Sequence, residues 1–109
     1  MSYHLTLKII ITVIWNISFL HSNGELIYKQ KCLQCHGINA KGNSKLKAPP
    51  LAGIPKYYSK TQLSNFKTGI RGAIPKDIAG FSMHLISKDL TELEIISVIN
   101  YLEKLPRYQ

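Results

Sequence analysis

The 109-residue sequence contains only two cysteines, Cys32 and Cys35, and both lie within four consecutive residues. Because they belong to one short motif, the chain has no structural disulfide that could join distant segments. A chain of this length has room for one domain. Small domains bury little apolar surface and usually need a cross-link or a bound group to become stable. The sequence therefore predicts a single domain whose core is completed by something other than a disulfide.

Acidic residues are also scarce: there are six, against 14 Lys and Arg, for a formal net charge of +8. None lies between Glu25 and Asp77. That interval holds ten basic residues: Lys29, Lys31, Lys41, Lys45, Lys47, Lys56, Lys60, Lys67, Arg71 and Lys76. Such an excess suits an acidic protein partner, an anionic membrane or nucleic acid. The chain has no nucleic-acid-binding motif and no interleaving of basic with aromatic residues, so we expect no nucleic-acid partner.

The N-terminal apolar region is too short for an ordinary membrane-spanning helix of about 20 residues. One cation, Lys8, precedes the apolar residues 9–20, and a polar step with small residues follows. This pattern predicts a signal peptide over residues 1–23, cleaved between residues 20 and 25, ahead of a domain at 24–109. The protein is then periplasmic. The alternatives are a buried core helix, or an uncleaved signal that remains as a membrane anchor.

The motif Cys32-Leu33-Gln34-Cys35-His36 is typical of covalent attachment of a c-type haem. On one helical turn the two thiols can reach the vinyl groups along one side of a porphyrin, and His36 then lies under the iron as its proximal ligand. A dithiol redox pair would need a surrounding βαβ pattern, which is missing. A zinc site would need a fourth ligand. The motif therefore predicts one haem c, attached through Cys32 and Cys35, which also supplies the missing apolar core.

Three helices are expected around this motif. They cover residues 25–34, a segment that begins at Pro55 or Ser59 and ends before Gly69, and a segment that begins at Thr91 and ends before Pro106. The intervening residues 37–48 and 69–82 are rich in Gly or Pro and are predicted to be irregular. Pro49-Pro50 is predicted to be extended and stiff, because proline fixes φ.

These patterns together resemble the class I c-type cytochromes, and in particular the small bacterial periplasmic monohaem members and single domains of their dihaem relatives. The resemblance covers about 80 residues. It is carried by Gly24, Ile27-Tyr28, the motif from Cys32 to Gly37, Pro49-Pro50-Leu51-Ala52-Gly53, Tyr58-x-x-x-Gln62-Leu63-x-x-Phe66-x-x-Gly69, Met83, and Leu90-Thr91-Glu92 with Tyr101-Leu102. It implies an all-α fold in which the N- and C-terminal helices cross beside the haem. Ser59 and Lys60, in place of apolar residues, and His84 depart from the family pattern.

The resemblance also implies that Met83 is the sixth ligand of the iron, opposite His36. Met1 is the only other methionine, and His84 is the alternative ligand. His/Met ligation leaves no open position for a substrate, so it predicts an electron carrier of a respiratory or dehydrogenase/oxidase chain and not an enzyme. The alternative is a haem protein that binds a small ligand, or has peroxidase activity, at a vacated sixth position.

Two further expectations concern charge. Arg71, in the segment before Met83, is predicted to bind a haem propionate, because a guanidinium can hold a carboxylate through two parallel hydrogen bonds. The alternative is that Arg71 is only a surface charge. The acid-free interval contains the haem-attachment motif, which favours docking onto an acidic redox partner such as a dehydrogenase, an oxidase or a membrane complex. The alternative is that these lysines only keep a small exported protein soluble. We expect the protein itself to be a monomer.

Overall fold

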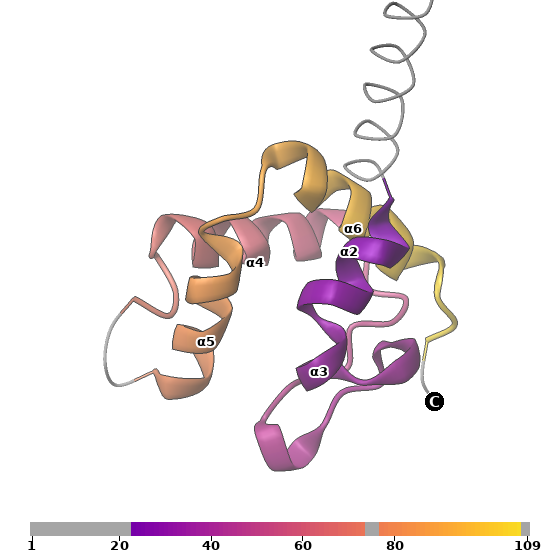
Figure 1. Cartoon of the computed structure of the whole chain (residues 1–109), viewed down its shortest axis with the longest axis horizontal. Helices are drawn as coiled ribbons and strands as arrows, with labels where there is room; N and C mark the ends of the chain where they lie inside the picture. Colours follow the sequence, from indigo (N-terminus) through magenta and orange to yellow (C-terminus); the bar gives the residue numbers. More distant parts are fainter. Residues whose placement is uncertain (1–22, 74–76, 108–109) are drawn as a thin grey trace, which may run out of the picture.

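The computed structural model describes residues 23–73 and 77–107 as a single helical unit (Figure 1). Its elements are α2 (Gly24–Lys31), α3 (Leu33–His36), η1 (Ile38–Ala40), η2 (Ser44–Leu46), α4 (Lys56–Thr68), α5 (Ile78–Ser87) and α6 (Glu92–Lys104). Within these residues there is no strand, only an isolated antiparallel bridge between Asn43 and Ala48. The all-α prediction is confirmed.

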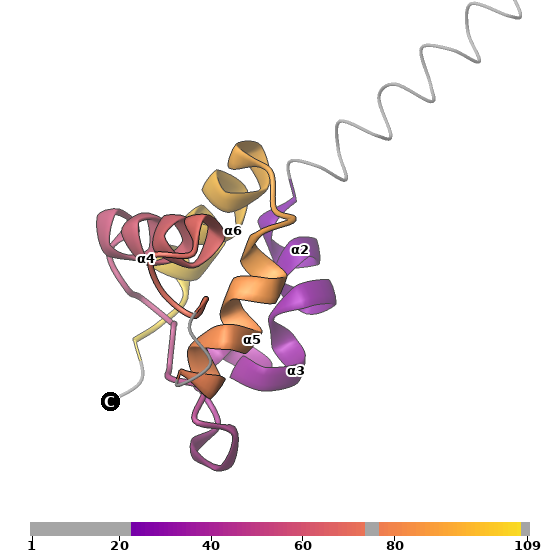
Figure 2. The ribbon, with the colours of Figure 1, turned by 90° about the vertical axis from the view of Figure 1, so that its left-hand side faces the viewer.

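Helices α2 and α6, the first and last in the described part of the chain, cross and build the core, as predicted (Figures 1 and 2). Gly24 allows the close approach, because a Cβ there would lie 2.0 Å from the carbonyl oxygen of Ser97 on α6. Below this crossing, Tyr28 packs with its ring centroid 5.6 Å from that of Tyr101. The buried cluster consists of Ile27, Tyr28, Ala40, Ala52, Leu90, Ile95, Val98, Ile99 and Leu102.

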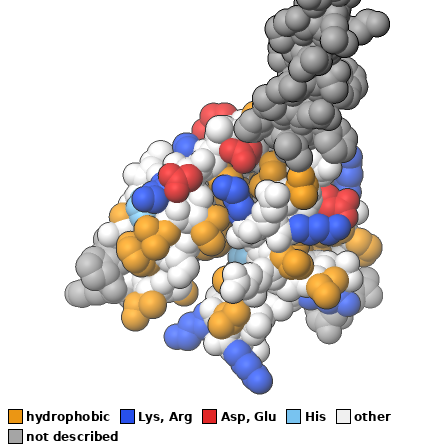
Figure 3. Space-filling model, viewed as in Figure 1, with side chains coloured by type: hydrophobic (Ala, Val, Ile, Leu, Met, Phe, Trp, Pro, Cys, Tyr) orange, Lys and Arg blue, Asp and Glu red, His pale blue; other side chains and the backbone are white. Residues whose placement is uncertain are grey.

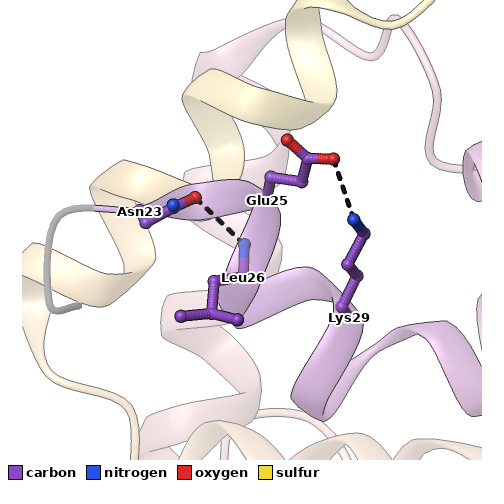
Figure 4. Close-up of polar contacts among 4 residues, drawn as sticks. All are labelled: Asn23, Glu25, Leu26 and Lys29. Atoms are coloured by element: carbon purple, nitrogen blue, oxygen red, sulfur yellow. Dashed lines mark hydrogen bonds and ion pairs between the residues drawn. The ribbon is translucent and has the colours of Figure 1, made fainter. Parts of the chain in front are cut away.

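Helix α2 starts where its local sequence satisfies the first backbone amides. The side chain of Asn23 accepts a hydrogen bond from the Leu26 amide at 3.1 Å, and Glu25 pairs with Lys29 one turn later at 3.1 Å (Figure 4). A side-chain acceptor at this position bonds a first-turn amide that has no partner within the helix. An acidic side chain in the first turn interacts favourably with the helix dipole and so stabilises the helix. The predicted helix over 25–34 is not continuous, however. It breaks at Cys32, where φ is −119°, and resumes as α3.

The prediction of an irregular segment up to Ser82 is wrong over its second part, because α5 begins at Ile78. Gly80 is one of the glycines whose presence in residues 69–82 predicts irregular backbone. Instead, its amide donates to the Asp77 side chain at 2.9 Å, which makes Asp77 the N-cap of a ten-residue helix. Met83 and His84 therefore lie within a helix. Helix α5 packs mainly against α4, whose first residue is Lys56 and not Ser59.

Helix α6 begins with the predicted capping box, in which Thr91 and Glu94 exchange hydrogen bonds with each other's backbone amides at 3.0 and 3.1 Å. Across residues 23–73 and 77–107, none of the helices has the length and apolar character required to cross a membrane. The predicted signal peptide lies outside the described residues, apart from its last residue, Asn23.

Candidate functional site

The motif that was predicted to attach haem lies at the junction of α2 and α3. Cys32 ends α2, whereas Cys35 and His36 belong to the single turn of α3. Gly37 ends that turn with φ of 82°, a conformation that favours glycine. The break at Cys32 thus turns the chain so that the second thiol and the imidazole project from a short helix of their own.

His36 is oriented by the chain beyond the motif. Its side chain is 4% exposed, and Nδ1 lies 2.9 Å from the carbonyl oxygen of Pro49. A carbonyl only accepts hydrogen bonds, so Nδ1 carries the proton and Nε2 presents its lone pair. Burial lowers the pKa of His36, which also favours the neutral imidazole. A buried, neutral imidazole with one nitrogen already hydrogen-bonded is a well-prepared metal ligand.

Cys32 and Cys35 are both free, partly buried thiols. Burial is the main cause that raises the pKa of Cys32 to about 11. Reactive dithiol pairs have a thiolate stabilised at low pKa, so this environment disfavours the redox-pair interpretation. Among residues 23–73 and 77–107, no group of three or more His, Cys, Asp or Glu side chains is arranged to hold a metal ion, so the described residues lend no support to a zinc site.

Met83 and His84 are consecutive on α5 and so project about 100° apart around the helix. His84 faces α4, because its Nδ1 lies 2.6 Å from the carbonyl oxygen of Phe66. Its Cε1 would lie 3.8 Å from a Cβ at Gly69. His84 therefore fastens α5 to the C-terminal end of α4, and Met83 occupies a different face of the helix.

Arg71 lies between α4 and α5, as the sequence indicated, but its guanidinium has partners within the protein. It donates to the Gln62 side chain at 2.5 Å, and its Cζ lies 4.4 Å from the centroid of the Phe66 ring. The group is exposed at the surface, so a carboxylate can still approach it. A propionate contact remains a prediction, and it would have to share the guanidinium with Gln62.

The described residues fit a flat apolar group placed between α3 and α5. Helix α5 is rich in apolar residues, yet none of its side chains joins the buried core cluster. Phe81 and Leu85 on α5 remain 44% and 43% exposed, and Ile38, just after the motif, is 75% exposed. The space-filling view is hollowed on the side where α5 faces the segment that carries α3 (Figure 3). A porphyrin in this place would cover apolar surface that the chain itself leaves open.

Two supporting contacts were not predicted from the sequence. One is the bond from His36 to Pro49, for which the only signal was the stiff Pro49-Pro50 segment. The other is the hydrogen bond of 2.5 Å from the Tyr28 hydroxyl to the Gly37 carbonyl, which ties the end of α3 to the core. Desolvation by burial is the main cause that raises the pKa of the Tyr28 hydroxyl to about 12, and the charges of Cys32 and Tyr101 add to the rise. The sequence placed Tyr28 in the predicted first helix but could not show where its hydroxyl would point.

Comparison with known proteins agrees with this site. A sequence model of the family described as "Cytochrome c" matches residues 21–106. The "Thiosulfate dehydrogenase electron acceptor" of Stutzerimonas stutzeri (strain A1501) is 29% identical over 113 residues, which cover 96% of this chain and 49% of that protein. The "Cytochrome c-554(547)" of Halothiobacillus neapolitanus is 35% identical over 63 residues, which cover 58% of this chain and 67% of the relative. The chain thus spans about half the length of the first relative. No solved structure matches it significantly.

Proposed function

This chain belongs to the cytochrome c family, and we propose that it carries electrons through an iron bound by His36 and Met83. The family and the spacing of Cys32 and Cys35 imply one covalently attached haem c, and an electron carrier and not an enzyme. When bound, the haem supplies an iron that exchanges single electrons. The chain's own residues, His36 and Met83, would hold that iron and set its environment.

The observation that carries the proposal is the orientation of His36. Its side chain is buried, and the Pro49 carbonyl binds Nδ1, so that Nε2 is left as the donor for iron. The hydrogen bond fixes the tautomer and increases the basicity of the ring, as supporting groups do for metal-bound histidines. An imidazole held in this way needs no rearrangement when the charge on the iron changes.

Met83 is the proposed sixth ligand. Its neighbour His84 is held against α4 by the bond to the Phe66 carbonyl, and this contact places the imidazole on the α4 side of α5. Methionine sulfur opposite histidine raises the reduction potential relative to two histidines. If His36 and Met83 both bound the iron, the small-ligand and peroxidase alternatives would have no open site.

The matched pair of variants Met83→Ala and His84→Ala tests the ligand. We expect Met83→Ala to lose the thioether-to-iron charge-transfer band at the red end of the oxidised spectrum, to lower the reduction potential and to bind carbon monoxide when reduced. His84→Ala should keep the band, although weakened packing of α5 on α4 can reduce its intensity. If His84→Ala lost low-spin ligation while Met83→Ala kept it, histidine would be the sixth ligand and the proposal would fail.

We further propose a periplasmic carrier, made with a cleaved signal peptide over residues 1–23, that works as a monomer with an acidic redox partner. The name of the Stutzerimonas stutzeri relative supports a thiosulfate dehydrogenase as the class of electron donor. The oxidised protein should be reduced when a purified thiosulfate dehydrogenase and thiosulfate are added together, which the absorbance of the reduced haem would show. Absence of reduction, when the same enzyme reduces its own acceptor, would exclude this donor and leave the carrier function untouched.

A further inference from the structure

We propose that Ala40 is a positioning residue for His36, the proposed iron ligand, because its left-handed backbone turns a carbonyl onto the segment that holds the imidazole. This inference rests on the proposed carrier function and adds to it a residue that does not itself touch the iron. Ala40 lies four residues after His36, is 0% exposed and has φ of 56°. A non-glycine residue stays in this conformation only where surrounding contacts hold it, and such residues cluster at functional sites.

The segment that holds the imidazole is called the strut here and comprises residues 48–52. Figure 1 shows the chain leaving α3, reaching the η2 turn at the lower end of the molecule and returning as this strut. The strut carries the Pro49 carbonyl, whose oxygen lies 2.9 Å from Nδ1 of His36. Neither Pro49 nor Pro50 has a backbone amide hydrogen that could hold this carbonyl in place. The strut must therefore be fastened by the residues on either side of the two prolines.

Backbone hydrogen bonds fasten the strut on both sides of the prolines. Before them, the Ala48 amide donates to the Asn43 carbonyl at 3.0 Å. After them, the amides of Leu51 and Ala52 both donate to the Ala40 carbonyl, at 2.8 and 3.2 Å. A carbonyl oxygen has two lone pairs and can accept both bonds, which together are called the clamp below. One carbonyl thus binds the first two amides that the chain offers after its proline pair.

The conformation of Ala40 is what allows its carbonyl to face the strut. Asn39 and Ala40 have φ of 61° and 56°, and together they turn the chain back after α3. An ordinary negative φ at Ala40 would rotate its carbonyl away from both amides. The Ala40 amide donates to the Gly37 carbonyl at 3.1 Å, and the Tyr28 hydroxyl binds the same carbonyl. Ala40 is therefore fixed to the core through its amide and to the strut through its carbonyl.

The contact that the clamp holds in place affects the electronic properties of the iron ligand. A carbonyl that accepts the Nδ1 hydrogen makes the His36 imidazole a stronger donor to a metal. Stronger donation favours oxidised iron, so the contact with the Pro49 carbonyl lowers the reduction potential and its loss should raise the potential. Ala40 acts on this contact only through the strut. A purely structural role of Ala40 would change the stability of the protein and leave the potential unchanged.

Backbone esters test the inference, because an ester in place of a peptide bond removes one amide hydrogen and keeps every side chain. The test variant carries the ester in place of the Leu51 amide. The matched control carries it in place of the Gly53 amide, which donates to the Leu102 carbonyl at 2.9 Å. The esters also alter the carbonyls of Pro50 and Ala52, to which no backbone amide of residues 23–73 and 77–107 donates. Both variants thus lose one backbone bond of similar length, and only the test variant loses it from the clamp.

The readouts are the reduction potential and the hydrogen exchange of the His36 ring N–H, followed by NMR of the reduced, haem-loaded protein. We expect the Leu51 ester to speed this exchange about 3- to 10-fold, the effect of one lost hydrogen bond, and to raise the potential. The Gly53 ester should lower the stability to a similar extent and leave both the exchange and the potential unchanged. Equal effects of the two esters, or no effect of the Leu51 ester, would overturn the inference.

Ala40→Gly is the second variant, because glycine adopts a positive φ readily and keeps the carbonyl of the clamp. It should leave the ring exchange and the potential as they are in the unchanged protein. If Ala40→Gly altered them as much as the Leu51 ester does, the methyl group and not the carbonyl would position the ring, which would also contradict the inference. The thioether-to-iron band of the unchanged protein tests the carrier separately. Its presence means that a negative result with the esters counts against Ala40 alone, whereas its absence would overturn the proposed ligation and the inference with it.

Discussion

The crossing of α2 and α6 depends on the absence of a side chain at Gly24, and Gly24→Ala tests this dependence. The added Cβ would lie 2.0 Å from the Ser97 carbonyl oxygen, 2.6 Å from its carbonyl carbon and 3.0 Å from the Tyr101 Cβ. Non-bonded carbon atoms prefer separations of about 3.5 Å, so the helices must part by roughly 1 Å. The clash involves the backbone of α6, so no rotamer change removes it.

The size of the effect follows from two opposing terms. Overpacking a filled core costs about 1–3 kcal/mol, and more when backbone must move. Alanine in a helix gains up to about 1 kcal/mol over glycine. We expect a net loss of about 2 kcal/mol in the free energy of unfolding, which for a domain of this size lowers Tm by roughly 8–16 °C.

Denaturant and thermal unfolding of the haem-loaded protein measure this loss. Gln30→Ala is the control, because Gln30 is exposed on the same helix and its replacement should change stability by no more than about 0.5 kcal/mol. Adding Ser97→Gly to Gly24→Ala should not restore stability, since the obstructing atoms are backbone. If Gly24→Ala were as stable as Gln30→Ala, the close crossing described here would be wrong.

Three further outcomes are expected. Tyr28→Phe should lose about 1 kcal/mol at neutral pH through the missing bond to the Gly37 carbonyl. Because the Tyr28 pKa is raised to about 12 in the folded protein, against about 10 when unfolded, the stability that its neutral hydroxyl supplies is complete below pH 10. That stability is lost as pH rises toward 12, so unfolding curves of the phenylalanine variant should lack this fall. Lys67→Met removes a cation bonded to the Lys88 and Leu90 carbonyls and should cost about 2 kcal/mol, measured by denaturant unfolding. Arg71→Gln should change the pH dependence of the reduction potential if the guanidinium binds a propionate, and identical curves would exclude that contact.

Much of the site could be predicted because its chemistry is local. The spacing of Cys32, Cys35 and His36 requires no distant contact to be recognised, and the capping box at Thr91 acts within one turn. Helix α5 was not predicted, because the residue types at its start argue against a helix. Gly80 is unfavourable in a helix, and only the hydrogen bond from its amide to Asp77 shows that the helix begins there.

The sequence by itself determined the cofactor, its attachment points and the helical composition, because these depend on residue types at short spacing. The tertiary structure decided which groups meet across the fold. It placed the Pro49 carbonyl on the His36 ring and the His84 ring on the Phe66 carbonyl. It also paired Lys56 with Glu103. Such contacts join residues 13 to 47 positions apart, and no local pattern specifies them. They arise only when the crossing helices and the loops have packed.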